Sequence, residues 1–287
     1  MSYVLLKQQI LLALLIVFVI SFNKVEAGYP FGGTCEVISP NKAMAIASKV
    51  VSGFRLKFNR GQSACKHNVE LIETNGEKIL KISTRLGDGI HTHRGERNIN
   101  GWSDIRAGNR RRFEFYTHTL INRDTAFRIE YSVRITQDNT FLSIPETKPY
   151  WYYITQVHPG CVCSSIMVVR VDRFKGIMAF DHVIQPVSEF GAIKTDYTPE
   201  VVGKWVKVAI EFKPSLTNGF RRLWVNDELV VNENNVPTFN GRPFTQFNIK
   251  FGIYQGTDSA KKQEEYPSIR QNNQQSIQFK NFKFKRI

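Results

Sequence analysis

The sequence predicts an all-β protein built as an antiparallel β-sandwich or jelly roll, in which one concave sheet forms a cleft. Apolar and polar residues alternate along much of the chain, most clearly at positions 127–136, and this is the pattern of a half-buried strand. The alternating segments are short and are separated by turn residues. A single segment carries the capping residues of a helix.

The first 27 residues have the pattern of a signal peptide. Lys7 precedes an apolar run at positions 10–20, and the segment ends with the small residue Ala27 before Gly28. The apolar run is shorter than the roughly 20 residues that a membrane span requires. We therefore expect a secreted, extracellular protein whose mature chain, residues 28–287, forms one domain and contacts no membrane.

The elements that the sequence predicts begin with a short helix after Ser39, with Pro40 at its first position and Gly53 beyond its end. Hairpin turns are predicted at Asn75-Gly76 and Asn226-Asp227. Strands are predicted at residues 69–73, 79–84, 127–135, 165–171, 206–212, 223–225 and 229–231.

The end of the chain predicts a closing strand with a β-bulge. Its alternation passes through Ile277 and Phe279 and then slips by one residue to Phe282 and Phe284. Loops rich in Gly, Asn and charge are predicted at residues 87–111, 137–148 and 258–275. No internal repeat or linker divides the domain.

The chain is strongly basic. Its formal net charge is +14, which becomes +13 when residues 1–27 are removed, and such a charge attracts polyanions. For a secreted protein the expected polyanion is an acidic glycan, and the chain has no zinc-finger spacing or aromatic-rich basic repeat that would indicate nucleic acid. We expect a monomer that binds no nucleic acid. An evenly spread solubility charge is the alternative interpretation.

The cysteine count predicts two disulfides, because the four cysteines are an even number in an oxidising compartment. A bridge between Cys161 and Cys163 would be strained at that spacing. Long-range pairs, or one bridge between Cys35 and Cys65 with two free thiols, are the alternatives.

Three predicted strand segments place polar side chains at alternate positions among apolar residues. The residues that share a face are Tyr152, Ile154, Gln156 and His158 in one segment, Arg112 and Glu114 in another, and Asn248, Lys250, Gly252 and Tyr254 in the third. We expect Gly252 to leave room for a ligand against the sheet.

Taken together, these segments resemble the heparin lyase I-like polysaccharide lyases. The resemblance lies in the Gln-Val-His sequence at 156–158, the Lys-Phe-Gly-Ile-Tyr sequence at 250–254, and the run from 203–205 through 223–226. The same order of motifs is similar to that of glucuronan lyases and alginate lyases, which share a concanavalin A-like jelly roll. Tyr116 and Asn248 depart from the alginate-lyase pattern, so the resemblance leaves the polymer open.

The resemblance implies cleavage of a uronate-containing polysaccharide, such as glucuronan, alginate or a heparin-like chain, by β-elimination. It implies that Arg112 and Gln156 bind the uronate carboxylate, since a guanidinium pairs with the anion and an amide donates a hydrogen bond to it. His158 is the expected base near neutral pH. Tyr254 is the expected acid or, on the other stereochemical course, both base and acid.

Further residues are expected to bind substrate, and no cofactor is expected. Those assigned to substrate binding are Lys250, Asn248, Tyr152, Glu114 and His93. For His93, a solvated loop residue is the alternative. The mechanism requires no metal, and no motif indicates a structural calcium ion. A zinc site formed by His158, Cys161 and Cys163 is disfavoured, because a secreted protein favours oxidised cysteines and the spacing offers no fourth ligand.

Two other classes of function compete with a lyase. A glycoside hydrolase requires paired carboxylates in one cleft, whereas Glu114, Glu130 and Glu211 are single acids in separate strands. A lectin-like module that binds acidic glycans without turnover is the stronger alternative. It would not require Gln156, His158 and Tyr254 together. A structural role in the extracellular matrix comes third.

Overall fold

The computed structural model describes residues 36–53, 55–58, 64–84, 110–117, 120–136, 150–159, 165–172, 177–184, 191–195, 202–239, 244–257 and 275–287. Its elements in chain order are β1 (Val37–Ile38), α2 (Pro40–Ala47), β2 (Val51–Ser52), β3 (Leu56–Phe58), β4 (Ala64–Cys65), a 3-10 helix (Lys66–Asn68), β5 (Val69–Thr74), β6 (Glu77–Thr84), β7 (Arg110–Thr117), β8 (Ile121–Asn122), β9 (Phe127–Ile135), β10 (Tyr150–His158), β11 (Met167–Asp172), β12 (Ile177–Ile184), β13 (Gly191–Thr195), β14 (Val206–Lys213), β15 (Gly219–Val225), β16 (Glu228–Val236), β17 (Gln246–Thr257) and β18 (Gln275–Arg286).

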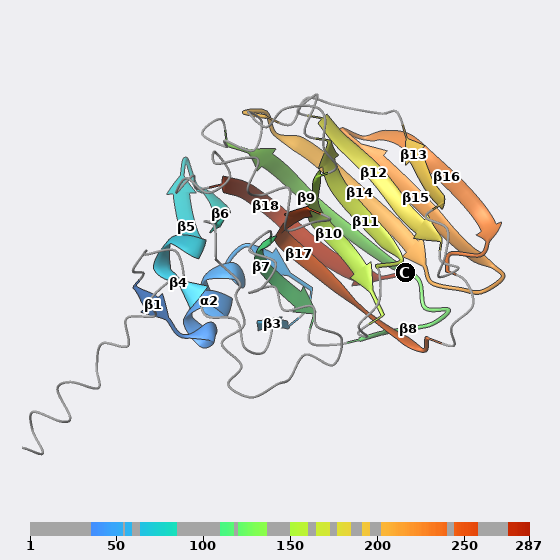
Figure 1. The fold of residues 1–287 in the computed structure, drawn as a ribbon, viewed down its shortest axis with the longest axis horizontal. Helices are drawn as coiled ribbons and strands as arrows, with labels where there is room; N and C mark the ends of the chain where they lie inside the picture. Colours follow the sequence, from blue (N-terminus) through green and yellow to red (C-terminus); the bar gives the residue numbers. More distant parts are fainter. Residues whose placement is uncertain are drawn as a thin grey trace, which may run out of the picture.

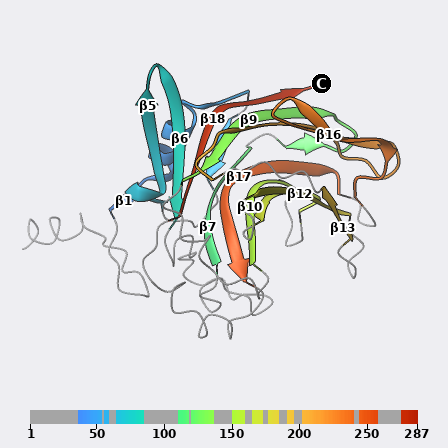
Figure 2. The ribbon, with the colours of Figure 1, turned by 90° about the horizontal axis from the view of Figure 1, so that it is seen from above.

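Two large sheets make up the fold, as predicted (Figure 1). The first, here the site sheet, has the order β13-β12-β11-β10-β17-β7-β3, with β8 beside β17. The second, here the back sheet, has the order β16-β15-β14-β9-β18-β6-β5, with β2 beside β18. Figure 2 shows the strongly bent β17 nested beneath the arc of β9 and β18, so the face of the site sheet turned away from the core is concave. The described strands pair antiparallel apart from the short β2–β18 contact, and one isolated parallel bridge joins Ile135 to Val202.

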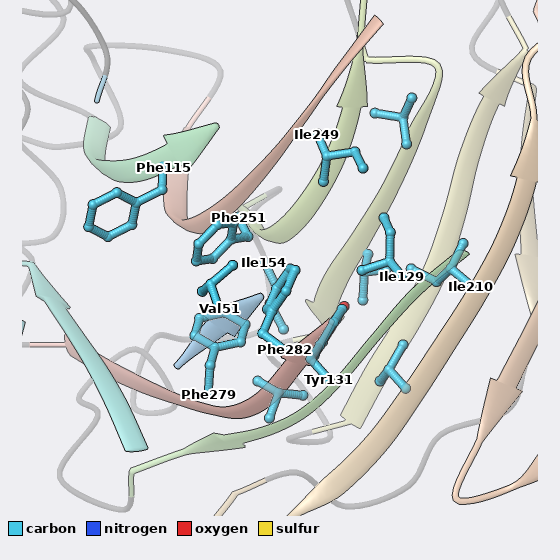
Figure 3. Packing of buried hydrophobic residues seen from close by; sticks show 14 of the residues in the cluster. Val51, Phe115, Ile129, Tyr131, Ile154, Ile210, Ile249, Phe251, Phe279 and Phe282 are labelled. Carbon is cyan, nitrogen blue, oxygen red and sulfur yellow. The ribbon is translucent and has the colours of Figure 1, made fainter. Parts of the chain in front are cut away.

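The core lies between the two sheets. Every second residue of β9, from Phe127 to Ile135, is at most 1% exposed, which confirms the alternation that predicted this strand. Phe282 stacks on Tyr131 with ring centroids 5.1 Å apart and lies 4.5 Å from the ring of Phe251, so aromatic rings of both sheets interlock (Figure 3). Burial of these rings supplies much of the hydrophobic stabilisation of the sandwich.

One buried hydrogen bond also joins the sheets. The hydroxyl of Thr155 donates to the hydroxyl of Tyr131 over 2.9 Å, and both side chains are buried. Burial raises the pKa of Tyr131, because an apolar environment disfavours the phenolate. The bond therefore joins two neutral groups and satisfies polar atoms that burial would otherwise penalise.

Local signals in the sequence account for several elements. Ser39 caps α2 by accepting a hydrogen bond from the backbone N–H of Lys42 at 3.2 Å, which confirms the predicted helix start. The turn residues Asn75 and Asn226 both adopt a positive φ of 50°, as hairpin turns of this type require. In β18 the register shifts between Lys280 and Lys283, which confirms the predicted bulge.

Some sequence-based expectations differ from the structure or lie outside it. Strands β12 and β13 were not predicted, nor were the short strands β1, β2, β3, β4 and β8. Strand β7 begins at Arg110, inside the loop predicted at 87–111. The predicted signal peptide at 1–27 and three of the four cysteines, Cys35, Cys161 and Cys163, lie outside the described residues. Cys65 is buried, and the disulfide pairing stays a prediction. Within the described part of the chain, no helix is both long and apolar enough to span a membrane.

Candidate active site

The outer face of the site sheet carries several of the polar residues that the sequence singled out. In β7, Phe113 and Phe115 point into the core, so Glu114 between them lies on the opposite face. In β17, Phe251 and Ile253 are buried in the core in the same way, which puts Lys250 and Tyr254 on the outer face. Two strands distant in sequence thus present their polar residues to one surface.

Strand order brings three distant segments together, because β17 lies between β10 and β7. Across β10 and β17, Gln156 is opposite Lys250 and His158 is opposite Asn248. Side chains of directly opposed residues on one face start only about 5 Å apart. The amide, the imidazole and the ammonium group therefore occupy one patch of the sheet.

Gln156 is the centre of a buried hydrogen-bond chain. Its amide N–H donates to a carboxylate oxygen of Glu114, and its carbonyl oxygen accepts from the hydroxyl of Ser165 at 2.5 Å. Glu114 and Gln156 are each 2% exposed, and Ser165 is 6% exposed. Ser165 is held beside Gln156 because the next residue, Ile166, donates its backbone N–H to the carbonyl of Val157 at 2.9 Å.

This chain fixes which way the Gln156 amide faces. A carboxylate only accepts hydrogen bonds, so Glu114 must face the amide nitrogen, and the Ser165 hydroxyl then donates to the amide oxygen. An amide nitrogen has two N–H groups, and the bond to Glu114 uses one of them. The other remains for a different acceptor, and polarisation along the chain strengthens that donor.

His158 and Asn248 form the second part of the patch. They are 9% and 8% exposed, respectively, and they face each other across β10 and β17. The side-chain oxygen of Asn248 is buried and has no hydrogen-bond partner in the structure. Buried polar atoms are normally satisfied, so this acceptor is an exception that needs a physical explanation.

Tyr254 lies beside a tyrosine that the alternation of the sequence did not indicate. Tyr153 is its register partner, and the two rings meet edge to face with centroids 6.0 Å apart. The pairing of β10 with β17 shifts between Tyr153 and Thr155, and the pairing of β10 with β11 shifts at the same two residues. A simple alternation of two could not identify Tyr153, since the bulge changes which residues share the face.

The same bulge corrects the expectation for Ile154. That residue is 1% exposed and belongs to the core, so it does not share a face with Gln156 and His158. Tyr152 lies in β10 opposite Gln255, but its side chain is outside the described part of the structure, as is that of Arg112.

The backbone of Arg112 pairs with Tyr254 in β17, and His93 lies outside the described residues altogether. The roles assigned to Arg112, Tyr152 and His93 therefore stay predictions.

The structure gives a reason for Gly252 in the packing of two strands, while its expected role as room for a ligand stays a prediction. Its φ is +137°, a conformation that residues with a side chain rarely adopt, and a Cβ there would lie 2.2 Å from the backbone oxygen of Phe113. The glycine is required by the close approach of β7 to β17. It holds Glu114, its register partner, next to the patch.

The other glutamates that were considered for hydrolysis lie on the back sheet. Glu130 and Glu211 both form ion pairs with Arg128, with nitrogen–oxygen distances of 2.5 and 2.9 Å, respectively. Arg128 in turn lies over the ring of Trp224 at 4.9 Å, so this is a surface network of ion pairs and aromatic contacts. Strands β7, β10 and β17 contain one carboxylate, Glu114, and a hydrolase requires two.

A metal centre finds no support in the described part of the chain. No group of three or more His, Cys, Asp or Glu side chains there could hold a metal ion. The cysteines of the alternative zinc site, Cys161 and Cys163, lie outside the described residues.

The fold and the patch define a jelly-roll protein with polar residues on the concave face of one sheet. The polysaccharide lyase family matches residues 52–276, and the chain therefore belongs to this family of enzymes. No curated protein sequence matches the chain.

Solved structures share the fold at low sequence identity. An endo-β-1,4-glucuronan lyase from the fungus Trichoderma reesei superimposes with a TM-score of 0.52 and 14% identity, over 82% of this chain and 92% of that chain. Alginate lyase A1-II′, a member of polysaccharide lyase family 7, gives 0.52 and 10%, over 78% and 85%. Alginate lyase vAL-1 from Chlorella virus gives 0.50 and 11%, over 88% and 99%.

Proposed function

We propose that this polysaccharide lyase is secreted and cleaves a uronate-containing acidic polysaccharide by β-elimination on the concave face of the site sheet. The observation that carries the proposal is the Gln156 amide, which Glu114 and Ser165 hold in one orientation beside His158 and Lys250. A binding module would not require an amide fixed so firmly next to an imidazole.

The reaction makes two demands on the site. Removal of the proton at C5 of the uronate places negative charge on the adjacent carboxyl group, so the site must stabilise that charge. The electron pair of the C5–H bond forms a double bond between C4 and C5 and expels the glycosidic oxygen at C4, which takes up a proton. The site therefore also needs a base and an acid.

Gln156 meets the first demand with its remaining N–H, which donates to the uronate carboxylate. Because the amide is already oriented, it loses little conformational freedom when substrate binds. The predicted partner in this role is Arg112, whose backbone lies in β7 opposite Tyr254. A guanidinium would neutralise the carboxylate that the amide orients.

His158 and Tyr254 meet the second demand. On one stereochemical course, the neutral imidazole of His158 takes the C5 proton and the phenol of Tyr254 protonates the leaving oxygen. On the other course, Tyr254 performs both transfers. Tyr153 packs edge to face on Tyr254 and holds its ring in position.

The substrate is a polymer of high negative charge, for which glucuronan, alginate and heparin-like chains are the candidates. The net charge of +14 favours such a polyanion. Two of the similar structures are named as lyases of glucuronan and of alginate. Lys250 contributes a positive charge beside Gln156 and binds a sugar carboxylate or sulfate.

The proposal is tested by incubating the mature protein with glucuronan, polymannuronate, polyguluronate, heparin, heparan sulfate and hyaluronan. The unsaturated product of β-elimination absorbs in the far ultraviolet, so the reaction is followed by absorbance. We expect a rise with at least one polymer and a loss of that rise in the variant His158→Ala if the imidazole is the base. Retained binding with no absorbance change on any polymer would replace the lyase by the lectin-like alternative.

A further inference from the structure

The Asn248 side-chain oxygen is a buried acceptor with no partner on the proposed catalytic face. The residue is 8% exposed, and its side-chain oxygen is buried and accepts no hydrogen bond. A buried polar group without a partner destabilises the folded state. Such a group persists at a functional site when a ligand supplies the missing partner.

The position of the Asn248 oxygen distinguishes it from the two other unsatisfied buried oxygens of the described residues. The oxygens of Thr84 and Gln275 are also buried without partners, but these residues pair with each other in the back sheet. Asn248 instead faces His158 across the strand pair, and Lys250 lies two residues further along the same face of β17. A sugar bound between the imidazole and the lysine therefore lies beside Asn248. Because the oxygen is buried, the Asn248 side chain must turn to present it to that sugar.

We propose that Asn248 determines polymer specificity by accepting a hydrogen bond from a sugar hydroxyl in the site. The inference rests on the proposed function for the class of substrate. The uronate carboxylate cannot fill this role, because an ionised carboxylate has no hydrogen to donate, whereas every uronate carries hydroxyl donors. Glucuronate and mannuronate differ in the configuration of the C2 hydroxyl, and guluronate differs from mannuronate at C5, which changes the ring shape and so the directions of its hydroxyls. One acceptor at a set place on the sheet therefore discriminates between these polymers.

The test compares Asn248→Leu with the wild type and with Gln275→Met. Leucine has nearly the shape of asparagine and removes the acceptor without opening a cavity. Gln275→Met is the matched control, since it also removes a buried acceptor without a partner but does so on the back sheet. Three quantities are measured for each protein: kcat/KM on glucuronan, polymannuronate and polyguluronate; binding of the same polymers in the His158→Ala background; and the melting temperature.

We expect Asn248→Leu to reduce kcat/KM on the preferred polymer about tenfold or more, because a buried hydrogen bond to substrate is lost. The values of kcat/KM on the three polymers should therefore lie closer together than in the wild type. Both variants should melt higher than the wild type, by about 2 °C or more, since each removes an unsatisfied polar group. Gln275→Met should keep the wild-type kcat/KM on every polymer.

The outcomes separate this inference from the proposed function. Unchanged cleavage and binding in Asn248→Leu would overturn the role of Asn248 and leave the lyase intact. Binding without cleavage in the wild type, weakened by Asn248→Leu, would overturn the lyase and support the role of Asn248. Neither cleavage nor binding of any uronate polymer by the wild type would overturn both.

Discussion

Replacing Glu114 tests whether this carboxylate contributes to catalysis by orienting Gln156 and without contacting the substrate. Its oxygen accepts the hydrogen bond that orients Gln156, and the side chain is 2% exposed. Glu114→Gln keeps an acceptor of the same shape, whereas Glu114→Leu keeps the bulk and removes the acceptor. A hydrogen bond to a charged group contributes about 1.5–3 kcal/mol, and 1.36 kcal/mol corresponds to a factor of ten in rate.

From these values we expect Glu114→Leu to lower kcat about 10-fold to 100-fold, because the Gln156 amide loses its fixed orientation towards the charge that develops on the carboxyl group. Glu114→Gln should keep kcat within about threefold, since the acceptor remains. It should also lower KM, because one negative charge is removed beside a polyanionic substrate.

The assay is the initial rate of product absorbance on the preferred polymer, with melting temperature as a check on folding. Glu130→Gln is the control, because Glu130 is an ion-paired carboxylate on the back sheet and its loss should leave kcat and KM unchanged. If Glu114→Gln is as inactive as Glu114→Leu, the negative charge itself is required and Glu114 is not a positioning residue. Full activity of Glu114→Leu would show that Gln156 does not depend on it.

Two further predictions concern the scaffold. Tyr131→Phe should destabilise the protein by about 1–2 kcal/mol in chemical denaturation, because Thr155 loses its partner, and the double variant with Thr155→Val should recover most of that loss. Burial raises the pKa of Tyr131 in the folded protein above its value in the unfolded chain, which is about 10. The contribution of Tyr131 to the stability of the fold is therefore complete below about pH 10 and is lost as the pH rises above that value. Stability of the wild type should therefore fall more steeply than that of Tyr131→Phe in alkaline solution, and equal slopes would contradict this. Gly252→Ala should cost about 2–3 kcal/mol or more, because its Cβ would lie 2.2 Å from the Phe113 oxygen at a φ of +137°. Gly76→Ala, where nothing lies within 4 Å of the Cβ, should cost only about 1 kcal/mol, and a similar loss at both positions would refute the argument from close approach.

The sequence predicted those parts of the structure that depend on local pattern. The alternation in β9, the cap at Ser39 and the bulge in β18 each follow from residues close together in the chain. Strand order is not local, and nothing in the sequence indicated that β17 lies between β10 and β7. The bond from Gln156 to Glu114 could therefore not be predicted, and Glu114 was assigned to substrate binding instead.

A bulge in the site sheet explains why the outer face of β10 differs from the prediction. One irregularity between Tyr153 and Thr155 moves Ile154 into the core and brings Tyr153 to Tyr254. Period-two reasoning fails beyond such a point, because one extra residue reverses the direction of every side chain that follows. Bulges occur preferentially next to active sites, where they redirect a side chain, so the failure of the pattern is itself informative.

The core of the sandwich positions the site, because the polar residues of the patch are adjacent in sequence to residues that pack in that core. Thr155 precedes Gln156 and is hydrogen-bonded to the back sheet, while Phe251 follows Lys250 and packs on Phe282. Phe115 follows Glu114, and its ring stacks on Phe251 at 5.6 Å between centroids. Each polar residue of the patch is therefore one peptide bond away from a side chain fixed in a close-packed core, which has little freedom to move. A rigid core of this kind is what an amide aimed at a developing charge requires, since catalysis by preorganised dipoles depends on their not having to reorient during the reaction.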